Sequence, residues 1–142
     1  MTANKVCPVV LRSVEPAREI LAFEHPLAGH QLVKGSIEAG ESMVSAALRE
    51  LAEESGLKGV HATRRLGTWE SGFQGQVWAF ILCESAERLP ESWLHHAPDD
   101  GGHDFRFFWH PLLTPAASGQ WHWVFQGALP FILAEVSSSR WT

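Results

Sequence analysis

The chain has 142 residues, of which 45% are hydrophobic and 19% are charged, and its formal net charge is -5. This length suits a single domain, and the hydrophobic share is enough for a packed core, which excludes wholesale disorder. Acidic side chains outnumber basic ones by 16 to 11, which argues against a protein held on nucleic acid by a general basic surface. A phosphate-bearing small molecule is still allowed, because a bound divalent cation reverses the local field.

Cysteine use and hydropathy predict the compartment. Cys7 and Cys83 are too few for a disulfide framework, so we expect reduced thiols in a cytoplasmic protein. No apolar run approaches the ~18 residues of a transmembrane helix. Residues 1–8 do not resemble a signal peptide. We therefore expect one domain over residues 1–142, with no membrane partner.

Stretches rich in β-branched and aromatic residues indicate strands. Pro8 lacks an amide hydrogen, which favours a sheet edge or the start of the first strand. Residues 76–84 are apolar on both faces and predict a central strand in a covered sheet. Residues 89–102 contain two prolines and two glycines and are interpreted as a long loop. Strands are expected over residues 6–14, 19–24, 60–69, 76–84 and 104–112, with a short paired stretch over residues 30–33.

The clearest helix is predicted over residues 42–55. Ser42 is suited to cap its first turn, and Gly56 can adopt the left-handed conformation that ends a helix. A second helix is expected over residues 120–136, kinked or restarted at Pro130. Strands on both sides of a helix predict an α+β fold in which a mixed β-sheet lies between helical layers. Apolar residues recur at helical spacing in the first helix and predict one buried stripe, Val44, Ala47, Leu48 and Leu51.

Three glutamates share one face of the first predicted helix. At ~100° per residue, Glu50 and Glu54 lie about 40° apart, and Glu50 and Glu53 lie about 60° apart. Like charges this close repel one another, and Arg49, four residues before Glu53, can neutralise one of them. A hard divalent cation would compensate the rest, Mg²⁺ first and Mn²⁺ as an alternative. Taken alone, the string is more typical of a solvated acidic face with one ion pair, because such strings are common on exposed helices.

The context of these glutamates favours the cation. Nine residues occur at the spacing G-x5-E-x7-R-E-U-x-E-E-x-G-U, where U is aliphatic: Gly35, Glu41, Arg49, Glu50, Leu51, Glu53, Glu54, Gly56 and Leu57. This segment resembles the Nudix box, with every specified position filled, and a chance match is expected on the order of once in a million such chains. The resemblance implies an αβα sandwich and hydrolysis of a nucleoside diphosphate linked to another group X.

The resemblance also implies roles for individual residues. In such enzymes the carboxylates matching Glu50, Glu53 and Glu54 hold the metal ions, and the backbone carbonyl of Lys34 is a candidate further ligand. Arg49 would orient a carboxylate. For the base that deprotonates the attacking water, Glu53 is the first candidate and Glu50 the second.

Markers outside the box do not identify a subfamily. Dinucleoside polyphosphate hydrolases tend to have a tyrosine where this chain has Phe73, and ADP-ribose hydrolases tend to have a proline where it has Gly72. Lys34 followed by glycine is similar to the start of the box in several polyphosphate-cleaving members. Phe73 and Trp69 are candidates for stacking on a base. The expected partner is a nucleotide-like small molecule, and the oligomeric state, a homodimer included, stays open.

A loop near the second half of the chain offers more carboxylates. Asp99, Asp100 and Asp104 flank a glycine pair and are candidates for an extra metal ligand or the base. The alternative is a polar, glycine-rich surface loop, since aspartate also favours turns. The eight histidines lack the spacing of a zinc site and are expected at the surface.

Two other functions are consistent with the same fold. A Nudix-fold domain that binds or senses a nucleotide without cleaving it would usually have lost a box carboxylate, and none is lost here. Processing of RNA ends keeps the chemistry with a larger substrate, but the negative charge and the lack of a basic tract count against it.

Overall fold

The computed structural model describes residues 2–14, 17–98 and 101–138. Within these residues the chain forms eight strands and two helices. In chain order they are β1 (Lys5–Val14), β2 (Ala17–His25), β3 (Gly29–Gln31), β4 (Gly35–Ser36), α1 (Met43–Ser55), β5 (Val60–Glu70), β6 (Val77–Ser85), β7 (Trp93–Ala97), β8 (His103–Pro111) and α2 (Phe125–Val136).

The strands form one mixed sheet in the order β5-β6-β1-β2-β8-β7, with β3 paired to β2 and β4 paired to β1. Strand β1 runs parallel to β6 and antiparallel to β2 and β4. Strand β6 lies between β5 and β1, and its side chains from Trp78 to Cys83 are buried. The central strand expected over residues 76–84 is therefore confirmed.

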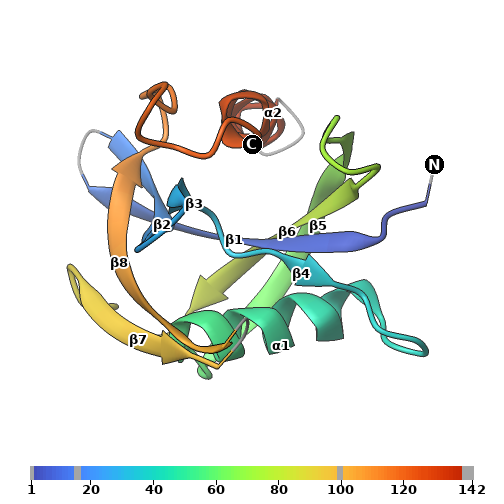
Figure 1. Ribbon diagram of the computed structural model, residues 1–142, viewed down its shortest axis with the longest axis horizontal. Coiled ribbons are helices and arrows are strands. Elements are labelled where there is room, and N and C mark those ends of the chain that lie inside the picture. Colours follow the sequence, from blue (N-terminus) through green and yellow to red (C-terminus); the bar gives the residue numbers. More distant parts are fainter. Residues whose placement is uncertain (1, 15–16, 99–100, 139–142) are drawn as a thin grey trace.

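The two helices cover opposite faces of this sheet (Figure 1). One hydrophobic cluster joins the buried side of α2 to residues of β1, β5 and β6, among them Trp78 and Phe80. The other joins α1 to the opposite face of β1, β2, β6 and β8, with Leu51, Phe23 and Phe107. The expected α+β sandwich, a mixed sheet between helical layers, is confirmed.

Strand β1 has a partner on one side only around Pro8. Residues 7–10 pair with β6, whereas the ladder with β4 ends at Val6 and the ladder with β2 begins at Leu11. Pro8 therefore occupies a locally unpaired side of an internal strand, where its missing amide hydrogen costs no ladder bond. The expectation that Pro8 marks a sheet edge or the start of the strand is wrong for the strand as a whole.

Strand β7 lies inside the stretch interpreted as a loop, so that interpretation is wrong for residues 93–97. Trp93, His95 and Ala97 alternate with more exposed residues, and the strand pairs with β8 from Trp93 to Ala97. It also reaches α1. The Trp93 Nε1–H donates to the Ser55 carbonyl at 2.9 Å, and His95 Nε2 lies 3.0 Å from the Glu53 carbonyl. Strand β7 thus supplies partners for carbonyls at the end of α1.

The caps of α1 are as predicted. The Ser42 hydroxyl accepts from the amide of Ser45, and Gly56 has φ +81°. The predicted apolar stripe needs one correction, because Val44 is 45% exposed and Ala46 is buried instead. The face that α1 turns to the sheet is therefore shifted from the one that its hydrophobic residues indicate.

Helix α2 is shorter than expected. It covers residues 125–136, and Pro130 lies inside it without a new start. The preceding residues instead bridge to β3, with the His30 amide donating to Gln120 at 2.9 Å and the His122 amide donating to His30 at 3.2 Å. None of the helices in the described residues is long and apolar enough to span a bilayer.

Candidate active site

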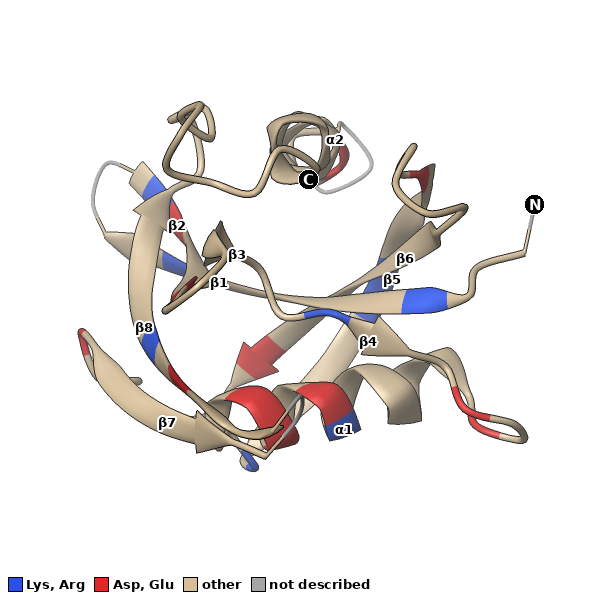
Figure 2. Ribbon diagram, viewed as in Figure 1, with Lys and Arg blue, Asp and Glu red and all other residues tan. Residues whose placement is uncertain are grey.

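Helix α1 holds three glutamates at one side of the sheet. Glu50 and Glu54 are buried, whereas the side chain of Glu53 is 41% exposed. Acidic residues gather on the second half of this helix in Figure 2. Their common face follows from the helical repeat, because Glu53 and Glu54 lie about 60° and about 40° to either side of Glu50. A carboxylate cluster that is mostly removed from water therefore lies between α1 and the sheet.

Arg49 ties the loop before α1 to the helix. Its guanidinium donates to the two oxygens of Glu41 at 2.7 and 2.9 Å, to the Ser36 carbonyl at 2.8 Å and to Glu50 at 2.8 Å. Glu53 lies farther away, at 3.4 Å. The hydrogen bonds from Arg49 lower the pKa of Glu41 to about 2. Arg49 thus contacts the carboxylates of Glu41 and Glu50, and its orienting role stays a prediction.

Gly35 brings the backbone against the Glu50 carboxylate. A Cβ atom at Gly35 would overlap the carboxyl group of Glu50, so no larger residue fits without moving that side chain. The close approach gives a physical reason for glycine at the start of the box. It also places the backbone that follows Lys34 beside a candidate metal ligand.

The donor set suits a hard divalent cation. Burial raises the pKa of Glu50, while hydrogen bonds with Arg49 and Glu54 oppose that shift. Two carboxylates in such contact ionise together only where a positive charge compensates them, and Mg²⁺ prefers oxygen ligands. In the part of the chain that the structure describes, no three His, Cys, Asp or Glu side chains already surround one point. The suitability of this site for a divalent cation therefore depends on these neighbouring carboxylates and on the backbone at Gly35.

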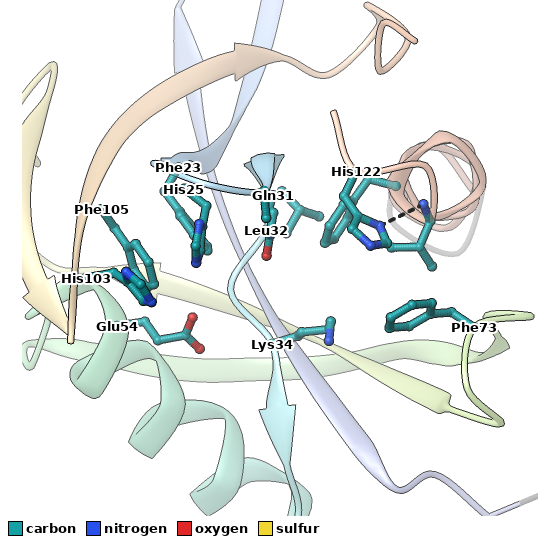
Figure 3. A pocket seen from close by; sticks show the side chains of 13 residues that line it. Phe23, His25, Gln31, Leu32, Lys34, Glu54, Phe73, His103, Phe105 and His122 are labelled. Carbon is teal, nitrogen blue, oxygen red and sulfur yellow. Dashed lines mark hydrogen bonds between the residues drawn. The ribbon is translucent and has the colours of Figure 1, made fainter. Parts of the chain in front are cut away.

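A pocket of about 350 Å³ opens beside this cluster (Figure 3). Glu54 lies at one end, Phe73 and His122 lie at the other, and Lys34 lies between them. A separate groove of about 550 Å³ is lined by Lys34, Glu50 and Glu53. Lys34 belongs to both cavities, so a ligand in the pocket can extend to the helix carboxylates. The side chains labelled around the pocket are Phe23, His25, Gln31, Leu32, Lys34, Glu54, Phe73, His103, Phe105 and His122.

Lys34 supplies a positive charge to the pocket. Its Nζ lies 5.7 Å from the ring centroid of Phe73 and 5.5 Å from that of Trp78. Burial lowers the pKa of Lys34, and the charge of Lys5 adds to the shift. The charges of Cys7, Glu54 and Glu50 oppose this shift without cancelling it. A half-buried ammonium in this state favours an anionic ligand.

Two histidines of the pocket are fixed by backbone amides. The Leu27 amide donates to Nδ1 of His25 at 3.0 Å, and the Val124 amide donates to Nδ1 of His122 at 3.2 Å. A neutral imidazole whose Nδ1 accepts a hydrogen bond carries its proton on Nε2. In their neutral form, both side chains are therefore Nε2–H donors.

The two aromatic residues predicted to meet substrate lie in different places. Phe73 lines the pocket, with its ring centroid 5.1 Å from that of His122. Trp69 packs beneath α2, 5.3 Å from Trp78 and so near Gly127 that a Cβ there would lie 2.9 Å from its indole. Trp69 does not line the pocket. Only Phe73 is placed to touch a ligand there.

The predicted acidic loop is described in part. Asp99 and Asp100 lie outside the described residues. Asp104 is exposed on β8, its Oδ1 lies 2.8 Å from Nδ1 of His96, and it lines neither the pocket nor the groove. Its role as a ligand or base stays a prediction. Its neighbour His103, expected at the surface as a bystander, is the residue that lines the pocket.

Sequence reasoning missed one wall of the pocket. The rings of His25 and Phe105 lie 5.2 Å apart, and those of His25 and His103 lie 4.8 Å apart. They meet because β2 pairs with β8, although about 80 residues separate them in the chain. The alternation along β8 was the available signal, since it puts His103 on the same face as Phe105.

Known proteins resemble this chain in both sequence and fold. Residues 7–125 match the NUDIX domain family. An RNA pyrophosphohydrolase of Bartonella quintana (strain Toulouse) is 26% identical over 117 residues, which make up 72% of this chain and 60% of that protein. The chain therefore spans less than two thirds of the length of this relative.

Two solved structures show how far the fold is shared. An ADP-ribose pyrophosphatase of Streptococcus suis 89-1591 superposes with a TM-score of 0.65 at 18% identity, covering 99% of this chain and 97% of that one. The Ap4A hydrolase of C. elegans gives a TM-score of 0.62 at 16% identity, covering 97% and 100%. The family match includes the whole box and most of the sandwich, so this chain belongs to the NUDIX domain family, the Nudix hydrolases.

Proposed function

We propose that the protein is a Mg²⁺-dependent pyrophosphohydrolase that cleaves the diphosphate linkage of a nucleoside diphosphate joined to another group. The observation that carries the proposal is the intact carboxylate cluster of α1, which lies beside a pocket lined by the Lys34 side chain and by aromatic rings. Diphosphate oxygens repel an attacking nucleophile, so a site for this reaction must neutralise them. The carboxylates, with a divalent cation, and Lys34 provide for this.

The metal ligands in this proposal are Glu50, Glu53, Glu54 and the backbone carbonyl of Lys34. When bound, Mg²⁺ neutralises phosphate oxygens and lowers the pKa of water. Arg49 keeps Glu50 in place through its 2.8 Å hydrogen bond. Mn²⁺, a similar hard cation, is expected to substitute.

Glu53 is the proposed base. Its side chain is more exposed than that of Glu50, and its contact with Arg49 is longer, 3.4 Å against 2.8 Å. A carboxylate with one weak partner is better able to accept a proton than one held firmly by a guanidinium. Glu50, the second candidate, is better placed to hold the cation.

Phe73 and Lys34 are proposed to contact the substrate. Lys34 lies between the pocket and the groove and can meet phosphate oxygens from either side. The aromatic lining suits a nucleobase. We propose a substrate of the nucleoside triphosphate or dinucleoside polyphosphate type. The name of the Bartonella relative makes an RNA with a 5′ triphosphate a further compound to test.

The experiment is a hydrolysis screen with Mg²⁺. Nucleoside triphosphates, dinucleoside polyphosphates, ADP-ribose, sugar nucleotides and 5′-triphosphate RNA are each incubated with the protein, and both products are identified. Glu54→Gln should lower the rate by at least about 100-fold with an unchanged fold, because the amide keeps the shape and loses the charge that holds the cation. The matched control is Glu84→Gln, on an exposed position of β6.

Full activity of Glu54→Gln would contradict the assigned ligand set. Binding of nucleotides by the unaltered protein, without hydrolysis of any compound, would instead favour the non-catalytic binding domain.

A further inference from the structure

His122 has no role in the chemistry proposed for the α1 carboxylates, yet its side chain lines the same pocket. Its backbone is held by the hydrogen bond from its amide to the His30 carbonyl, at 3.2 Å. Its ring is held by the Val124 amide on Nδ1 and packs edge to face with Phe73 at 5.1 Å. Both backbone and ring are therefore fixed before any ligand arrives.

The other ring nitrogen of His122 is available. In the part of the chain that the structure describes, Nε2 has no hydrogen-bond partner. The ring lines the pocket above Lys34 and Phe73 in Figure 3. Burial, and then the charge of Lys34, lower the pKa of His122, so the ring is neutral near pH 7. A neutral ring with Nδ1 occupied has one remaining donor, Nε2–H, and this ring is close enough to the Lys34 ammonium to be affected by its charge.

We propose that His122 is a substrate-binding residue, whose Nε2–H acts with the Lys34 ammonium as a subsite for phosphate oxygen at the end of the pocket away from Glu54. The proposal rests on the function proposed above and refines it. The helix carboxylates and their cation serve the linkage that is cleaved, and the His122 subsite serves an additional phosphate. The substrate it fits therefore carries a chain of three or more phosphates, as opposed to a diphosphate sugar.

Two substitutions distinguish a ligand-binding role of the His122 side chain from a purely structural one. In His122→Asn, the side-chain oxygen can still accept from the Val124 amide, but the Nε2–H donor is gone. In His122→Gln, the longer side chain carries its NH₂ group near the former Nε2, but the acceptor for Val124 is lost. A ligand-binding role predicts that the glutamine variant binds phosphate better than the asparagine variant, and a purely structural role predicts the opposite order.

The probe is the bis-methylene analogue of inorganic triphosphate, which resists hydrolysis, titrated calorimetrically in the presence of Mg²⁺. We expect His122→Asn to weaken its binding about tenfold or more, the usual effect of losing a hydrogen bond to a charged group. His122→Gln should retain most of the affinity. Adenosine, which has no phosphate, should bind all three proteins alike. For the methylene analogue of pyrophosphate, His122→Asn should lower the affinity less than it does for the triphosphate analogue.

The proposal would be overturned if the wild type and His122→Asn bound the triphosphate analogue with equal affinity. It would also be overturned if the wild type did not bind this analogue. The proposal would also fail if His122→Asn lost as much affinity for adenosine as for the triphosphate analogue. Ring ¹⁵N NMR gives an independent readout, since the Nε2–H resonance of His122 should be present at pH 7 and shift on titration. These measurements need no turnover, so a protein that binds the analogue through His122 but hydrolyses nothing would contradict the proposed function and leave the subsite standing.

Discussion

Several residues of the box have separate physical tasks, and at Gly35 the task is to leave room for the Glu50 carboxylate. Replacing it with alanine forces the Glu50 carboxylate out of place. We expect Gly35→Ala to lower hydrolysis on the order of 100-fold, because a small displacement of a catalytic group has that effect. Overpacking should also lower the free energy of unfolding by about 1–3 kcal/mol. Initial rates and urea unfolding test both.

The control for this substitution is Gly59→Ala. No atom lies within 4 Å of a Cβ built at Gly59, so this variant should match the wild type in rate and stability. If Gly35→Ala also matched the wild type, the close contact with Glu50 would not matter for catalysis.

Glu41 provides a prediction about pH. The hydrogen bonds from Arg49, and then the Glu38 amide, lower its pKa to about 2 in the folded protein. Because the folded pKa is below the unfolded value of about 4.3, the stabilisation is complete above that value and is lost as the pH falls towards 2. The difference in melting temperature between the wild type and Glu41→Gln should therefore shrink from pH 6 to pH 2. A constant difference would show that the Glu41 charge is not involved.

At the scale of elements, the end of α1 depends on β7. The Trp93 indole donates to the Ser55 carbonyl, and its ring stacks on Phe107 at 5.1 Å. Trp93→Phe keeps an aromatic ring and removes the donor, so the free energy of unfolding should fall by about 1 kcal/mol. Trp123→Phe is the control, because Trp123 is 53% exposed and its indole donates no hydrogen bond in the described residues. Urea unfolding that ranked the two variants equally would contradict the capping role.

Local signals predicted the elements whose determinants are local. Helix α1 has its cap at Ser42 and its end at Gly56 because each acts on its own turn. Strand β7 was missed because the prolines and glycines that flank it dominate the composition of residues 89–102, while its pairing with β8 is a contact between segments. The start of α2 was placed too early because residues 120–122 contain no glycine or proline to mark a break, although they pair with β3.

The same division applies to the site. Glu50, Glu53 and Glu54 were predictable because one helix brings them together. The pocket wall was not, since His25, His103 and His122 come from three segments that meet only through sheet pairing. Whether a histidine lines a cavity depends on its neighbours in space. The alternation along β8 indicates the face on which His103 lies, but not that a cavity opens there.

At the scale of the whole molecule, the two cysteines report on global unfolding. Both are free thiols, and both are buried. Burial raises the pKa of Cys83 to about 11 and raises that of Cys7 further. Because the thiolate is the reactive form, a thiol reagent should label the native protein only through its unfolded fraction, and a reducing agent should not change the melting temperature. Labelling rates across a urea series test this.

Rapid labelling of native Cys7 that a nucleotide prevents would contradict that expectation. The Cys7 thiol is close enough to Lys34 and Glu54 for their charges to affect its pKa, so such a result would make it part of the pocket floor.

The contact between Gly35 and Glu50 also fixes how long the intervening chain can be. One residue inserted between Met43 and Arg49 would turn the rest of α1 by about 100°. The carboxylates would then leave the Gly35 backbone, although the helix itself could still form. Length variation is therefore excluded from the first half of α1. Near Gly59, after the helix has ended and where no atom crowds the backbone, an added residue would leave the orientation of α1 against the sheet unchanged.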